Sequence, residues 1–214
     1  MAHITTVDLT NGIPTAGTGT VYTLDQIVAL LPAALAANGG LKIEGVASGV
    51  AVPTSGYQVT CSTDITRPGD TTAYTANDTW ADSTSAPTTG GFTLTGAARA
   101  SGGSGLITDI YFLSSAVPGT LLQAEMHIFD SAATAVNDNA AWNLSDADAK
   151  LRIAIVPFAL VADANNSYYH AQNLNIGFTC VGSANLRYLI KVKNAYTPIS
   201  GEVLTVRAKI IQST

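Results

Sequence analysis

The chain has 214 residues, which is long enough for one all-β domain with an additional N-terminal segment, or for two small domains. Its net charge of −5 argues against a nucleic-acid-binding protein, because such proteins need basic surfaces to meet phosphate groups. Charged residues make up only 12% of the chain, about half the usual share, which favours a subunit that buries part of its surface in an assembly.

No segment predicts export or a membrane span. The first residues, MAHITTVDLT, lack the basic and apolar regions of a signal peptide. The longest apolar run, 153–162, is interrupted by Pro157 and is much shorter than the roughly 20 residues that a spanning helix needs. We therefore expect a soluble protein that is made in the cytoplasm.

Residues 1–56 are predicted to precede the β domain as an arm followed by one short helix. Residues 1–22 are rich in Thr, Gly and Ala, a composition typical of an extended arm that orders against a partner. A capping box begins at Thr23 and an Asn-Gly-Gly stop ends the pattern, so we expect a helix at about 23–37, which Pro32 should kink or split. Its apolar face would pack on this chain's own β domain, or on a neighbouring subunit, through Leu24, Ile27, Val28, Leu31 and Leu35.

The stretch DITRPGDTTAYTAND, at 64–78, separates an almost uncharged beginning from a succession of strand-like runs. Its Arg-Pro-Gly-Asp segment, 67–70, predicts a turn, because Pro fixes φ and Gly takes conformations that other residues avoid. An ordinary surface hairpin would explain this turn. The polar residues that follow, 77–91, predict a long loop that carries Trp80.

Residues 57–214 are predicted to form one all-β domain. About eight to ten short strand-like runs follow one another, with turn signals between them and no long helix. Several connections are too long for simple hairpins, so we expect Greek-key wiring in a jelly-roll-like β-sandwich. One capped helical turn is expected at 143–150, where Ser145 would be the N-cap. The predicted strands are 57–63, 71–75, 92–98, 106–113, 121–129, 151–161, 174–181, 186–193 and 203–211.

Basic residues concentrate near the C-terminus. Lys42 is the only Lys or Arg before residue 67, whereas Glu202 is the single acidic residue in 187–209. This end of the chain could meet an acidic partner surface, although solvated strand faces and strand edges protected by Lys are the simpler explanation. The basic residues there are Arg187, Lys191, Lys193, Arg207 and Lys209.

Local signatures of catalysis are missing from the sequence. It contains no nucleophile elbow, P-loop or dinucleotide-binding glycine motif, and its three Glu residues suggest no glycosidase pair. His3, His127 and His170 lack a short metal-ligand spacing, and His127 alternates with Glu125 on a strand face that we expect to meet solvent. A cupin-like metal site from distant histidines stays an alternative. We expect no enzyme activity, no catalytic residue, no metal site and no cofactor.

The two cysteines and a group of acidic and amide side chains are explained by structural roles rather than by a binding site. Cys61 and Cys180 lie in separate strand-like runs and form no CxxC pair, which predicts buried free thiols, or a disulfide if the two strands are neighbours. The densest group of acidic and amide side chains lacks the spacing of an EF-hand, and Asx turns and helix capping explain it more simply than a bound cation. Its members are Asp130, Asn137, Asp138, Asn139, Asp146 and Asp148.

Three segments resemble, in their order, a group of virion proteins of tailed bacteriophages. They are DITRPGDTTAYTAND, then GLITDIYFLSS after a Gly/Ser turn, then LQAEMHIFDSAATAVNDNAAWNLSDADA, so the resemblance covers roughly Asp64 to the end of the chain. The helix with NGGLKIEGV also looks like a segment found upstream in such proteins. The last of the three segments carries the resemblance at Phe129, Asp130, Asp138, Asn139, Ala140, Ala141, Ser145, Asp146 and Asp148.

This resemblance implies a non-enzymatic head decoration, or cement, protein with a jelly-roll-like domain. We expect it on the outside of the virion capsid, as a dimer or trimer that binds the major capsid protein, stabilises the head and has no nucleic-acid or membrane partner. The alternative is a carbohydrate- or host-binding jelly-roll module of a head or tail fibre. In that case the stacking rings would be Trp80, Trp142, Tyr168 and Tyr169.

Overall fold

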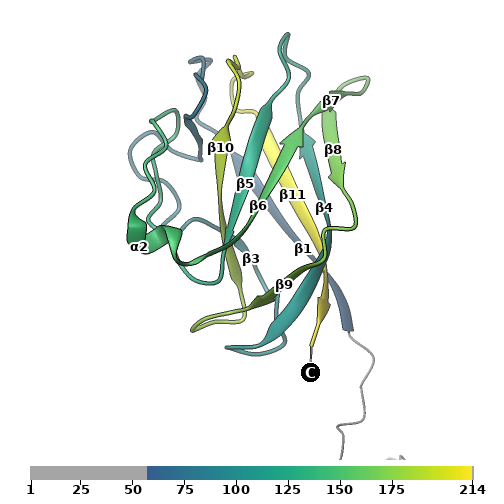
Figure 1. Cartoon of the computed structure of the whole chain (residues 1–214). Helices are drawn as coiled ribbons and strands as arrows, with labels where there is room; N and C mark the ends of the chain where they lie inside the picture. The colour runs from purple at the N-terminus through teal and green to yellow at the C-terminus, as the bar shows by residue number, and fades with distance from the viewer. Residues whose placement is uncertain (1–56, 214) are drawn as a thin grey trace, which may run out of the picture. The chain divides into compact units, whose positions relative to one another are not determined.

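The computed structural model of the protein describes residues 57–213. Figure 1 shows them as two β-sheets packed face to face, with the short helix α2 (Asp146–Ala149) beside them. The predicted all-β sandwich is thereby confirmed. The predicted helix at 23–37 lies outside the described residues, as do its apolar side chains Leu24, Ile27, Val28, Leu31 and Leu35.

The first sheet has the strand order β1–β11–β4–β8–β7, and β9 pairs with the other end of β4. Every pair in it is antiparallel. One irregularity interrupts the long β4–β11 ladder, between Lys209 and Ile210. The strands are β1 (Tyr57–Thr66), β4 (Ser104–Ser114), β7 (Val161–Ala162), β8 (Ser167–Ala171), β9 (Ile176–Thr179) and β11 (Val203–Gln212).

The second sheet has the strand order β2–β10–β5–β6, and β3 also pairs with β10. Pro157 lies in β6, at the edge of this sheet, where its missing N–H leaves no central ladder bond unmade. The strands are β2 (Thr79–Trp80), β3 (Phe92–Leu94), β5 (Gln123–Phe129), β6 (Arg152–Ala159) and β10 (Leu186–Val192).

The chain crosses between the two sheets at most of its connections. It runs from β1 to β2 and β3, returns to β4, crosses to β5 and β6, returns to β7, β8 and β9, crosses to β10 and ends in β11 beside β1. Such alternation, with the first and last strands paired, is the wiring of a jelly roll. The Greek-key prediction is thus confirmed.

The core lies between the sheets and follows from the alternation of each strand. In β11, Leu204, Val206, Ala208 and Ile210 are buried, and the residues between them are more exposed. The Phe112 and Phe158 rings stack across the core, with centroids 3.9 Å apart and planes 10° apart. These contacts join β4 of one sheet to β6 of the other.

Cys61 and Cys180 are both buried and unbonded to each other, as the free-thiol prediction required. Burial raises the pKa of the Cys61 thiol to about 11, and the nearby Cys180 adds to this shift. A thiol with so high a pKa stays protonated at neutral pH and behaves as a small apolar group in the core.

Several elements differ from the prediction. Residues 71–75 form no strand, because only Tyr74 pairs, in a single bridge to Tyr196. The short strands β2 and β8 were not predicted, since each is held by its neighbours rather than by a long alternating pattern of its own, and the predicted run 151–161 divides into β6 and the start of β7. The helical turn is confirmed: Ser145 caps α2 and accepts a hydrogen bond from the Asp148 N–H. Within 57–213 no helix has the length and apolarity to span a membrane.

Replacing Phe112 by Ala should lower the free energy of unfolding by about 3–5 kcal/mol, because it leaves a cavity between the sheets. Urea unfolding would measure the loss. The control is Tyr57→Ala, at a position that is 61% exposed, which should change stability by less than about 0.5 kcal/mol. Equal effects of the two substitutions would show that Phe112 is not a core contact.

Candidate functional site

A buried ion pair joins the turn after β1 to the connection between β5 and α2. Arg67 Nη2 lies 3.2 Å from Asp138 Oδ2, and neither side chain is exposed to solvent. Tyr74 lies between them, since its hydroxyl accepts a hydrogen bond from Arg67 Nε (3.0 Å) and donates one to Asp138 Oδ1 (2.6 Å). The Ala81 N–H also donates to Asp138 Oδ1, at 2.8 Å. Both charges are therefore surrounded by partners, as buried charges require.

Aromatic rings enclose this ion pair. The Arg67 guanidinium lies over the rings of Tyr74 and Trp80, 5.3 and 5.9 Å from their centroids. The Tyr74, Trp80 and Tyr196 rings pack against one another at 5.6–5.9 Å. The predicted turn at 67–70 is anchored by Arg67, which bonds to Asp70 and is only 2% exposed, while Gly69 and Asp70 remain at the surface.

A second buried carboxylate, that of Glu202, closes the same end of the sandwich. It accepts hydrogen bonds from the hydroxyls of Tyr196 and Ser114 and from the N–H of Ile199. Burial, and then the Glu202 charge, raise the pKa of Tyr196. Burial also raises the pKa of Asp138, against the opposing effects of its donors and of the Arg67 charge.

This buried network has no side chain free to meet a ligand. Its charged groups and the hydroxyls of Tyr74 and Tyr196 are paired with one another, its rings face the core, and the indole N–H of Trp80 is buried with no hydrogen-bond partner among the described residues. Three of its members, Arg67, Tyr74 and Asp138, lie in two of the three segments that resemble phage virion proteins. These residues hold the loops at one end of the sandwich together.

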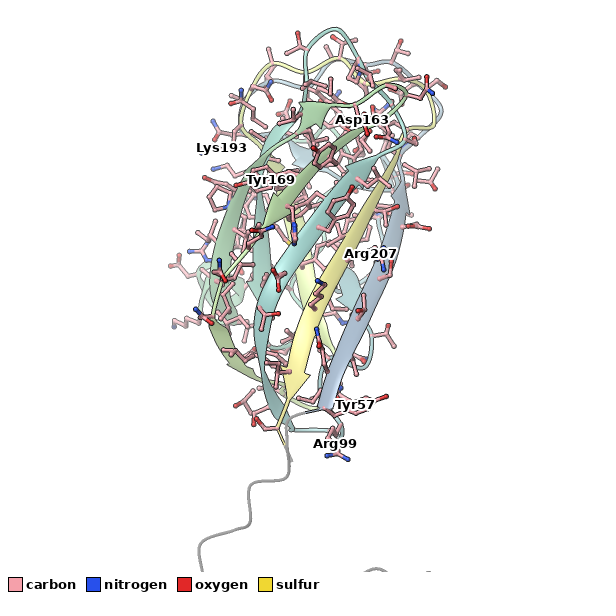
Figure 2. All side chains as sticks on the ribbon, turned by 90° about the vertical axis from the view of Figure 1, so that its right-hand side faces the viewer. Tyr57, Arg99, Asp163, Tyr169, Lys193 and Arg207 are labelled. Carbon is pink, nitrogen blue, oxygen red and sulfur yellow. The ribbon has the colours of Figure 1, made fainter. Side chains whose placement is uncertain are left out.

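The exposed face of the first sheet carries a groove of about 400 Å³. Alternation along four strands turns these side chains outward, and Figure 2 looks onto this face, with Arg207 on β11. In the register of the sheet, Arg207 lies opposite Tyr111, which lies opposite His170. Lys209 stands between Thr60 and Asp109 in the next row. The groove lining is Thr60, Asp109, Tyr111, His170, Arg207 and Lys209.

The groove combines aromatic rings with polar and charged groups. Tyr111 and Tyr168 are stacked, with ring centroids 6.0 Å apart and planes 23° apart, and the edge of His170 faces Tyr111 at 5.9 Å. His170 Nε2 lies 3.5 Å from Asp109 Oδ1, and its Nδ1 lies 2.9 Å from the Gln172 amide nitrogen. Such a surface suits the binding of a small polar ligand rather than burial against a large apolar partner.

The two basic groups of the groove, Arg207 and Lys209, have no carboxylate within 4 Å among the described residues. Both side chains are exposed. They are among the basic residues for which the sequence suggested an acidic partner surface.

His127 is buried, contrary to the expectation that it meets solvent. It lies on the outer face of the second sheet but is only 3% exposed, because the connection between β5 and β6 folds back over it. Its ring packs against Trp142 at 4.5 Å, and its Nδ1 lies 3.1 Å from Arg152 Nη1. Since Arg only donates, Nδ1 is the acceptor and the neutral ring carries its proton on Nε2, 3.5 Å from Glu125 Oε2.

This environment opposes protonation of His127. Burial, and then the charge of Arg152, lower its pKa from 6.5 to about 4, while Glu125 partly counteracts them and Lys191 adds a smaller lowering effect. The imidazole is therefore neutral at pH 7.

The rings proposed for glycan stacking are not gathered in one place. Trp80 is fully buried and stacked on Tyr74, so neither of its faces is available. Trp142 covers His127, and Tyr169 turns toward the core, 6.5 Å from Phe112. Tyr168 alone of the four lies beside the groove, and it is 38% exposed.

The other candidate sites are also dispersed. Between residues 57 and 213 no three His, Cys, Asp or Glu side chains are grouped as metal ligands would be. His127 and His170 lie on different sheets, so they do not form a cupin-like pair. In the acidic and amide group, Asp138 pairs with Arg67 and Asp148 bonds to Ser145 and to the Thr134 N–H.

Sequence reasoning missed the groove and the ion pair. The alternation Val-Arg-Ala-Lys in β11, 206–209, was a signal that Arg207 and Lys209 share a face. No local signal could place Tyr111 and His170 beside them, because this depends on which strands become neighbours.

No protein-family model matches the chain, and no curated protein matches it. Among solved structures, the D431N mutant of the VP2 protein of infectious bursal disease virus is 12% identical over 80% of this chain, with a TM-score of 0.15. A structure of the Gx strain of the same virus is 14% identical over 80% of this chain, with a TM-score of 0.14. The chain spans 44% and 45% of the length of those chains, and likenesses this weak carry no argument.

Replacing Asp138 by Asn should destabilise the protein by about 3 kcal/mol, because it leaves the Arg67 charge buried without a counter-charge. The control is Asp163→Asn, an exposed residue in the turn between β7 and β8, which should change little. Urea unfolding of both variants would measure the difference. Similar stabilities of the two variants would contradict a buried ion pair.

His127 should make the protein less stable as the pH falls. Its folded-state pKa of about 4 is below its ordinary value of 6.5. Between these two pH values the unfolded chain therefore binds a proton at His127 and the folded protein does not. The contribution, about 3 kcal/mol, is present above pH 6.5 and is lost as the pH falls to about 4.

The variant His127→Gln keeps an acceptor for Arg152 but cannot titrate. Unfolding free energies measured between pH 7 and pH 4 should therefore fall less steeply for this variant than for the wild type. Tyr57→Thr, far from His127 in sequence and at an exposed position, should retain the wild-type slope. An unchanged slope in His127→Gln would show that another group causes the acid sensitivity.

Proposed function

We propose that this protein is a non-enzymatic structural protein of a tailed-phage virion, a decoration subunit that binds the outside of the head. The proposal rests on where the structure places the residues that resemble those of phage virion proteins. Arg67, Tyr74 and Asp138 meet in one buried network that braces a jelly roll. The residues that carry the resemblance thus stabilise the fold and do not form a reactive centre, which is what a structural subunit requires.

The properties of the described domain support this role. The buried charges of Arg67, Asp138 and Glu202 are hydrogen-bonded within the domain, which fixes the loops at one end of it and favours a rigid body for binding. A decoration subunit of this kind would add buried interface between capsomers and so oppose the pressure of the packaged DNA. Its partners would be the major capsid protein and further copies of itself, in a dimer or trimer, with the contact made by residues 1–56.

A carbohydrate- or host-binding module of a fibre is the second candidate. One observation favours it, the polar and aromatic groove on the first sheet. The groove is lined by Tyr111, with Tyr168 stacked beside it, and it leaves out Trp80, Trp142 and Tyr169, so this candidate now depends on a different set of residues.

Co-sedimentation with expanded, undecorated heads of the same phage tests the decoration role. The full chain should bind saturably at a fixed ratio to the major capsid protein. Removal of residues 1–38 should abolish binding or change the oligomeric state, while the described domain keeps its thermal stability. Binding and oligomeric state that do not change on truncation, or a full chain that stays in the supernatant, would overturn the proposal.

A further inference from the structure

We infer that the groove on the exposed face of the first sheet is a binding site for an acidic saccharide, a sugar that carries a carboxylate. This site goes beyond the decoration role and does not depend on it, because every residue of the groove belongs to the described domain. The inference rests on three features of the groove, which are its charge, its aromatic rings and the shape of the sheet that carries it.

The charge of the groove favours an anion. Arg207 and Lys209 project from alternate positions of β11 and have no carboxylate partner among residues 57–213. Asp109 is the acidic side chain of the lining, and it is engaged with His170. In a chain with a net charge of −5, this local excess of positive charge makes the groove complementary to an anion. The guanidinium of Arg207 can hold a carboxylate with two parallel hydrogen bonds.

The aromatic groups favour a sugar as the carrier of that carboxylate. Tyr111 and Tyr168 stack beside the basic pair and form an aromatic surface across β4 and β8. The face of a pyranose ring that carries C–H groups packs well on such a surface. Around it, Thr60, Asp109 and His170 offer donors and acceptors for hydroxyl groups.

The size and setting of the groove favour a small ligand over an acidic peptide. A volume of about 400 Å³ is in the range of small-molecule sites and would hold one or two sugar rings. The lining comes from β1, β11, β4 and β8, whose backbone groups are paired in the sheet ladders. An extended peptide would normally add to a free strand edge, which the middle of this sheet lacks, so recognition here depends on side chains.

Titration of the full-length protein with trigalacturonate, followed by NMR or calorimetry, tests the inference. The matched neutral probe is the methyl ester of the same trisaccharide. We expect the acid to bind with a millimolar or lower Kd and its ester to bind at least about tenfold more weakly, because the ester cannot form the charged contact. Raised salt should weaken binding of the acid.

Two pairs of variants locate the site. Arg207→Gln should weaken binding of the acid by about tenfold, whereas Arg99→Gln, with the same loss of charge at an exposed turn, should not. Tyr111→Thr should weaken binding of both probes, whereas Tyr57→Thr, at the exposed start of β1, should leave it unchanged. Thermal unfolding of each variant checks that the domain remains folded.

Three outcomes would overturn the inference: no binding of the acid at about 10 mM, equal binding of acid and ester, or equal losses in the test and control variants. Equal competition by inorganic sulfate and by the acid would also overturn it, since the groove would then recognise any anion. None of these results bears on head binding, so this inference and the decoration role can fail independently.

Discussion

The ion pair between Arg67 and Asp138 is the interaction on which one end of the sandwich depends. It joins residues 71 positions apart and brings the end of β1 beside the connection that follows β5. A charge removed from water is tolerated only with a complete set of partners, and here Tyr74, Asp70 and the Ala81 N–H complete it. We infer that this contact selects one arrangement of the loops, because each alternative arrangement would leave a buried charge unpaired.

The two sheets of this braced domain present different exposed faces. The second sheet is partly covered by its own chain, since the connection from 130 to 151 places Trp142 over His127 and builds a small second core. On the first sheet, β11 and β4 instead turn charged and aromatic side chains outward around a groove. On the covered part His127 is constrained by burial, whereas Arg207 and Lys209 of the groove are exposed and available for contact. The exposed face of the first sheet is therefore better suited to bind a small ligand than the outer face of the second sheet.

The sequence predicted much of the fold but little of the site. The long alternating strands were recognisable because one face of each meets the core, and Ser145 was recognisable as a cap because capping is local. Arg67 looked like part of a surface turn and His127 like a solvent-facing residue. Both are buried by segments distant in sequence, which no local pattern reveals. Trp80 is likewise buried, so it cannot serve as a stacking ring for a glycan.

By itself the sequence determined the all-β class, the alternation that turns Arg207 and Lys209 to one side of a strand, and the capped helical turn at Ser145. These properties depend on the periodicity and composition of short segments. Tertiary structure alone decided that Arg67 meets Asp138, that Trp142 covers His127, and that Tyr111 and His170 stand in one row with Arg207. Those contacts arise from strand order and register, which are set by the packing of the whole core and not by any single segment.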